Sequence, residues 1–143
     1  NMPQLIDKFN KILEKLKEYD LVLLSRYVEG GGDQRSKLRI LSSKILNQFC
    51  RIILGNEIKD YTSSIFLMNR SVLNHGVPIA YGHGEFFIEF LYKVKKKGIK
   101  ICEIPYVQPP DEEGSKTASS IFRFITLGLS YFIRIIITRF RNN

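Results

Sequence analysis

The chain has 143 residues, enough for one domain with a core and too few for two. Apolar residues make up 44% and charged residues 25% of it, which excludes a disordered or collagen-like chain. Lys and Arg number 22 against 14 Asp and Glu, and the resulting net charge of +8 favours an anionic partner: a nucleic acid, a phosphorylated ligand or a membrane surface.

The first half of the chain predicts a helix, a strand and a second helix. Apolar side chains recur at helical spacing over residues 2–18, and the apolar run at residues 21–24 is typical of a strand covered on both faces. After the glycine-rich loop at residues 29–33, a helix is expected from about residue 35 to 54. Its predicted buried side consists of apolar residues: Leu38, Leu41, Ile45, Phe49 and Ile52.

The second half continues the alternation of strands and helices. Residues 62–68 predict a strand, residues 85–97 a helix that ends in lysines and Gly98, and residues 99–107 a further strand. This alternation indicates the α/β class. A helix that leads directly into a buried strand leaves the sheet without a first strand, so we expect the chain to be the later part of a longer protein. Cys50 and Cys102 lie in apolar runs and are expected to be free thiols in a reducing compartment.

Basic residues gather where an α/β sheet binds ligands. Arg26 directly follows the first strand, and ligands collect at the carboxyl ends of strands in open α/β sheets. Arg39 and Ser43 are four residues apart near the start of the next helix, so they project from one face. Together with the positive end of the helix dipole, these groups could hold a phosphate. The alternative is a solvated, basic start of a helix.

Other polar segments allow two interpretations each. Asp60 is either a site carboxylate or, with the hydroxyl residues after it, part of a local Asx or Ser/Thr turn. Ser115 and Lys116 follow a glycine and are candidates for a second phosphate contact, although the glycine spacing of a P-loop is absent. No His, Cys and carboxylate pattern predicts a metal site. Nucleic acid is not an expected partner, because the aromatic residues are not interleaved with basic ones.

Several segments, in order, resemble the dolichol-phosphate mannosyltransferase-like branch of the family 2 glycosyltransferases, which transfer sugars to polyprenyl phosphates. The resemblance covers roughly residues 20–117 and departs from the branch at Asp111, where the branch usually has an arginine. The matching segments are Ser25-Arg26-Tyr27 before a glycine-rich loop, Arg39-x-x-x-Ser43 followed by Asn47, Asp60-Tyr61-Thr62-Ser63-Ser64, Arg70-Ser71-Val72-Leu73, Phe86-x-x-Glu89, Glu103-Ile104-Pro105-Tyr106 and Gly114-Ser115-Lys116.

The resemblance implies a GT-A fold, of which residues 1–117 would be the acceptor-side, C-terminal portion of the catalytic domain. It implies an inverting transfer from a nucleotide-sugar to a polyprenyl phosphate whose phosphate is held by Arg26, Arg39 and Ser43. Ser115 and Lys116 would contact phosphate or donor, and Asp60 and Glu89 would support the site. A divalent metal, Mg or Mn, would be bound by an Asp-x-Asp segment that this chain lacks, so the chain alone is expected to be inactive. The alternative is a non-catalytic basic module that binds a membrane or a lipid phosphate.

The segment 118–143 is predicted to be an amphipathic helix at a membrane interface. Residues 121–140 match a bilayer core in length, but arginines lie inside the segment. Arg123, Arg134 and Arg141 fall along one stripe and could reach the headgroups of anionic lipids. The protein would then lie peripherally on the cytoplasmic face of a membrane. The alternative is a core helix packed on the sheet.

Overall fold

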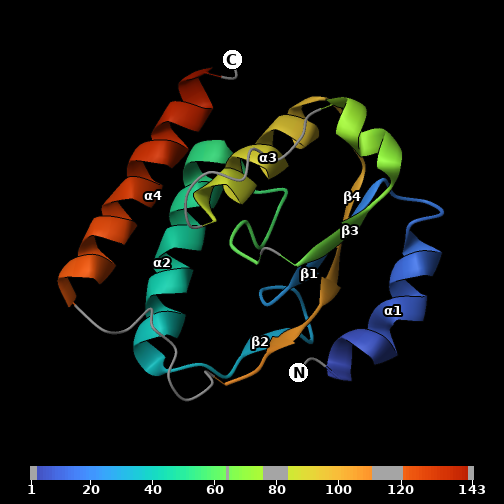
Figure 1. Cartoon of the computed structure of the whole chain (residues 1–143), viewed down its shortest axis with the longest axis horizontal. Coiled ribbons are helices and arrows are strands. Elements are labelled where there is room, and N and C mark those ends of the chain that lie inside the picture. Colours follow the sequence, from blue (N-terminus) through green and yellow to red (C-terminus); the bar gives the residue numbers. More distant parts are fainter. Residues whose placement is uncertain (1–2, 64, 76–83, 111–120, 142–143) are drawn as a thin grey trace.

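The structure of the chain is a computed structural model that describes residues 3–63, 65–75, 84–110 and 121–141. Four α-helices, one 3-10 helix and five strands make up the described part (Figure 1). In chain order these elements are α1 (Pro3–Lys15), β1 (Leu21–Ser25), β2 (Gly32–Asp33), α2 (Lys37–Leu54), β3 (Phe66–Met68), η1 (Arg70–His75), α3 (Glu85–Lys96), β4 (Ile101–Pro105), β5 (Val107–Gln108) and α4 (Ile121–Arg141).

The main sheet has three strands in the order β3-β1-β4. The central strand β1 runs parallel to β4, with Leu21 opposite Ile101, and antiparallel to β3, with Leu21 opposite Met68. The short pair formed by β2 and β5 is a second, parallel sheet next to the carboxyl end of β4. The predicted α/β class is confirmed, with a small mixed sheet.

The core has two parts, one on each face of the main sheet, because side chains alternate along β1. Leu21 and Leu23 point into the larger part, which α2, α3 and α4 cover. Val22 and Leu24 point to the other face, where they pack with Ile12 of α1. All five residues of β1 are buried, as the apolar run predicted.

Helix α2 forms where it was predicted, but its expected buried side is wrong. Of the five apolar residues assigned to that side, four are 54–69% exposed: Leu38, Leu41, Ile45 and Ile52. The side of α2 that meets the sheet carries Asn47, Cys50 and Leu54 instead. A buried Asn47 is tolerated there because backbone groups of a neighbouring loop satisfy its amide.

Helix α4 packs beside α2 and across α3 (Figure 1). Phe132 of α4 meets Phe49 of α2 edge to face, with ring centroids 4.6 Å apart, and Ile135 is fully buried. The segment is therefore a helix, as predicted, and it is attached to the domain. Within the described residues, no helix has the length and apolar character needed to cross a membrane.

Candidate polar site at the end of β1

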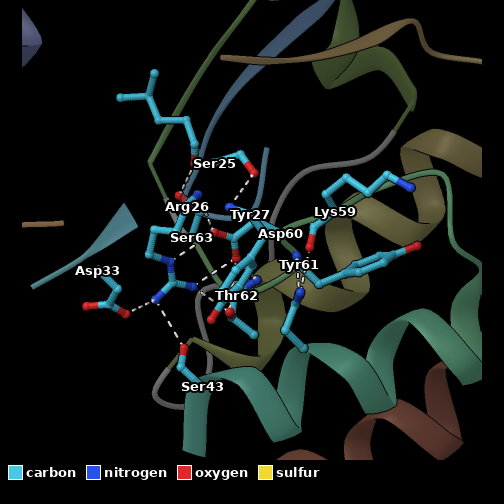
Figure 2. Close-up of polar contacts among 12 residues, drawn as sticks. Ser25, Arg26, Tyr27, Asp33, Ser43, Lys59, Asp60, Tyr61, Thr62 and Ser63 are labelled. Atoms are coloured by element: carbon cyan, nitrogen blue, oxygen red, sulfur yellow. Dashed lines mark hydrogen bonds and ion pairs between the residues drawn. The ribbon is translucent and has the colours of Figure 1, made fainter. Parts of the chain in front are cut away.

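Arg26 lies at the centre of a buried polar network (Figure 2). It directly follows β1, and its side chain is 3% exposed. The Arg26 Nε donates to Oδ2 of Asp60 at 2.9 Å, and Nη2 donates to Oδ1 of the same carboxylate at 2.8 Å. This two-pronged contact is the geometry in which a guanidinium binds a carboxylate most strongly.

The remaining edge of the Arg26 guanidinium points to α2 and β2. Its Nη1 donates to Oγ of Ser43 on α2 at 3.1 Å, and it lies 3.6 Å from Oδ2 of Asp33 on β2. Nη2 also donates to the Thr62 hydroxyl at 2.6 Å. The longer separation from Asp33 makes Nη1 the nitrogen held least tightly by a carboxylate.

The loop that carries Asp60 is clamped from two sides. On one side, the Glu103 carboxylate of β4 accepts hydrogen bonds from the backbone N–H groups of Lys59 and Asp60, at 2.7 and 3.0 Å. On the other, the Asn47 amide of α2 donates to the Lys59 carbonyl at 2.5 Å and accepts from the Tyr61 N–H at 2.8 Å. Two separate elements, β4 and α2, therefore hold the loop that positions the Asp60 carboxylate.

Charges at the site are balanced in two pairs. Arg26 faces Asp60, and Arg35 faces Asp33 with Nη2 and Oδ2 2.6 Å apart. Burial would lower the pKa of the Arg26 guanidinium, but the hydrogen bonds and charge of Asp60 outweigh it and raise this pKa. Burial would raise the pKa of Asp33, but the hydrogen bonds from Arg35 outweigh it and lower this pKa. Each of these two shifts favours the charged form, so Arg26 and Asp33 both remain ionised at neutral pH.

The structure brings together three of the predicted site residues: Arg26, Ser43 and Asp60. Arg39 is half-buried and lies one helical turn before Ser43 on α2. Asp60 forms the predicted Asx-type turn, since its Oδ1 accepts from the Thr62 N–H at 3.1 Å, and the same carboxylate binds Arg26. The local turn is therefore present, and the carboxylate that forms it is also the partner of Arg26.

The other predicted site residues are Glu89, Ser115 and Lys116. Glu89 lies on α3, where it pairs with Lys93 and with Arg134 and Arg141 of α4. Ser115, Lys116 and the departure at Asp111 lie outside the described residues.

The carboxylates of this site do not fit a divalent metal. Each oxygen of Asp60 already accepts two or more hydrogen bonds, and the Asp33 carboxylate is held by Arg35. Across the described ranges, no group of three or more His, Cys, Asp and Glu side chains could hold a metal ion. The Mg or Mn ion that the resemblance implies is expected to bind an Asp-x-Asp segment, not these residues.

Sequence reasoning assigned no role to Asn47 or Glu103, although both stood in the segments that resemble the family. The available signal was a polar residue inside an otherwise apolar helix or strand, because such a residue has to find partners when it is buried. A scan against family models and a search of curated proteins find no match to this chain.

Proposed function

We propose that this chain is the acceptor-side part of a glycosyltransferase that moves a sugar from a nucleotide-sugar to a polyprenyl phosphate at a membrane surface. The GT-A fold and the peripheral, cytoplasmic-face location belong to the same proposal. The observation that carries it is the 3.1 Å hydrogen bond between Arg26 and Ser43, which joins two of the residues that the resemblance assigns to the acceptor phosphate.

The phosphate would bind beside Ser43, at the first two turns of α2. The Ser43 hydroxyl and the Arg26 Nη1 are adjacent there, and Arg39 is one turn earlier on the same helix. The amino-terminal end of a helix carries a partial positive charge that favours an anion. Arg26 keeps its bonds to Asp60 in this arrangement and acts mainly through Nη1, since its other nitrogens are committed to the loop.

Transfer to a phosphate at such a site depends on neutralising and positioning that phosphate, and it does not require a strong general base. A lipid phosphate is already ionised at neutral pH, so its oxygen can attack the anomeric carbon of the donor sugar once it is held in line. Arginine suits this role because its fork can make two bonds to a phosphate. The donor and its metal have no assigned ligands among the described residues.

Binding of geranyl phosphate, a short and soluble prenyl phosphate, tests the proposal. Hydrogen bonds to charged groups contribute about 1.5–3 kcal/mol, so Arg39→Ala is expected to weaken binding roughly ten- to hundredfold. Arg39→Lys should restore little, because one ammonium cannot make a two-pronged contact.

Arg51→Ala is the matched control, since Arg51 lies on the same helix and donates to Asn56 at 2.6 Å, away from Arg26. Equal affinities of the Arg39→Ala and Arg51→Ala variants, measured by calorimetry, would contradict the assignment.

The alternative proposal is a lipid-phosphate-binding module without transfer. The engagement of Asp33 and Asp60 by arginines is compatible with both functions, because both need only that the phosphate is held. The coding sequence upstream of Asn1 separates the two functions: an Asp-x-Asp segment after a set of strands supports the transferase, and a start codon alone supports the module.

A further inference from the structure

Helices α2 and α4 expose a large number of apolar side chains on the outside of the molecule. We call these residues the α2–α4 face; on α2 they are 54–69% exposed and on α4 43–75% exposed. Its members are Leu38, Leu41, Ile45 and Ile52 on α2, and Leu129, Ile133, Ile136, Ile137 and Phe140 on α4. Soluble proteins rarely leave so many neighbouring apolar groups in water, and such a surface marks an interaction site.

The two helices present these residues on the same side. Phe49 and Phe132 mark the line of contact between α2 and α4, which lie side by side in Figure 1. At about 100° per residue, the exposed residues of α2 lie on one side of Phe49, and the core residues Cys50 and Leu54 lie on the other. On α4 the exposed residues and the buried Ile135 are likewise on opposite sides of Phe132. The exposed stripes therefore meet at the helix contact and form one face.

The polar stripe of α4 faces the protein. Arg134 pairs with Glu89 of α3 through Nη2 and Oε2 at 2.6 Å, Arg141 pairs with the same carboxylate, and Arg139 donates to the Tyr92 hydroxyl at 2.9 Å. The expectation that the arginines of this stripe point to lipid headgroups is therefore wrong for Arg134, because buried Glu89 holds it. The Arg123 side chain lies outside the described part of α4.

With Arg134 and Arg141 paired with Glu89, α4 offers its apolar side to the surroundings. Burial would raise the pKa of Glu89, but Lys93 and Arg134 outweigh it and lower this pKa, so the carboxylate stays charged and keeps α4 in this orientation.

The charges of the two helices select the occupant of this face. Neither α2 nor α4 contains an Asp or Glu, whereas together they contain eight Lys and Arg. Lys37, Lys44 and Arg51 are spaced seven residues apart, so they line the flank of α2 beyond the apolar stripe. An apolar strip bordered by cations suits a bilayer with anionic headgroups. A second copy of the chain would bring two such basic borders together, which like-charge repulsion opposes.

We infer that the α2–α4 face lies in the interface of an anionic bilayer, with both helix axes along the membrane surface. The sequence assigned membrane contact to the C-terminal helix alone, whereas this inference adds α2, the helix that also carries Arg39 and Ser43. It rests on the proposed function in one respect: a bilayer along α2 would bring the phosphate site close to the acceptor lipid. Vesicle binding is measured without any prenyl phosphate, so the two ideas can fail separately.

A single tryptophan reports on the face directly, because the chain has none of its own. In Ile45→Trp the indole would lie in the α2–α4 face. In the control Ile6→Trp it would lie on α1, where Ile6 is 78% exposed and which covers the other face of the sheet (Figure 1). With vesicles of phosphatidylcholine and phosphatidylglycerol at 3:1, the Ile45→Trp emission should shift to the blue and be quenched by brominated acyl chains. The Ile6→Trp emission should do neither. A response from Ile6→Trp and none from Ile45→Trp would overturn the inference.

Co-sedimentation with the same vesicles gives the size of the effect. Ile45→Ser with Ile136→Ser should weaken binding at least tenfold at both low and high salt, while Ile6→Ser changes it less than twofold. Lys44→Gln should weaken binding mainly at low salt, where surface attraction is unscreened. Circular dichroism of each variant confirms that the fold is kept, as expected for exposed positions. Wild-type chain that stays in the supernatant, or a stable dimer in solution that Ile45→Ser separates, would show that the face serves another partner.

Discussion

Replacing Asp60 by asparagine tests whether one carboxylate organises the site. Asp60 is fully buried, and its Oδ2 accepts from the backbone N–H and Nε of Arg26, while its Oδ1 accepts from Nη2 and from Thr62. The Asp60→Asn variant has nearly the same shape but turns one acceptor oxygen into an NH₂ group that faces other donors. It also leaves the Arg26 charge with Asp33 at 3.6 Å as its nearest remaining carboxylate.

The expected loss of stability is large for so small a change. Removing one member of a buried ion pair costs about 3–5 kcal/mol, a sizeable part of a total free energy of unfolding of roughly 5–15 kcal/mol. For a chain of this size the melting temperature should fall by about 10 °C. Replacing both Arg26 and Asp60 by leucine should cost less than the sum of the single replacements, because no unpaired charge remains.

Urea and thermal unfolding followed by circular dichroism measure this loss. Asp20→Asn is the matched control, because the Asp20 carboxylate accepts a hydrogen bond from the Lys100 N–H at 2.9 Å in an exposed setting. That variant should lose about 1 kcal/mol or less. If Asp60→Asn and Asp20→Asn lose equal stability, Asp60 does not act as the buried counter-ion of Arg26, and the reasoning is refuted.

Three further predictions concern other parts of the chain. The cations around Glu89 lower its pKa in the folded protein. The stability that Glu89 contributes is therefore complete above its unfolded pKa of about 4.3 and is lost as the pH falls through the lower folded value. The free energy of unfolding of Glu89→Gln should not show this loss between pH 5 and 3, and a pH profile equal to that of the wild type would refute the prediction. Burial raises the pKa of the Cys50 thiol to about 12, so a thiol reagent at pH 8 should modify the half-buried Cys102 first, and equal rates would contradict the buried placement. Gly31→Ala should cost about 1–3 kcal/mol, since its Cβ would lie 2.7 Å from backbone carbonyl oxygens. Gly128→Ala on α4 meets open space and should stabilise by up to about 1 kcal/mol. A denaturation midpoint that does not fall in Gly31→Ala, or that falls in Gly128→Ala, would contradict the respective prediction.

Local patterns predicted the helices and the first strand well, but the strand expected over residues 62–68 is only β3, and β2 lies in the predicted glycine-rich loop. The run at residues 21–24 is the buried strand β1, and the lysines before Gly98 end α3 as expected. The positions of Arg26 after the first strand and of Ser43 near the start of the next helix also predicted two residues that the fold brings together. These predictions succeeded because they used the spacing of residues within one element and the position of a residue at the carboxyl end of a strand, where ligands gather.

The errors arose where a distant residue decides which way a helix faces. Periodicity showed that α2 has an apolar stripe, but not that Asn47 on another side would bind the loop before β3 and turn Ile45 outward. In the same way, the arginine stripe of α4 is apparent in the sequence, whereas its partner Glu89 lies 45 residues before Arg134. A buried charge can override the usual rule that the apolar side of a helix faces the core.

The central claim is that a prenyl phosphate binds between Arg26 and the first turns of α2, and a crystal structure with geranyl phosphate tests it most directly. The account predicts a phosphate oxygen within hydrogen-bond distance, about 2.7–3.2 Å, of the Ser43 hydroxyl and of the Arg39 guanidinium, with the Arg26–Asp60 pair intact. A phosphate bound instead along Lys37, Lys44 and Arg51, with no density beside Ser43, would contradict it.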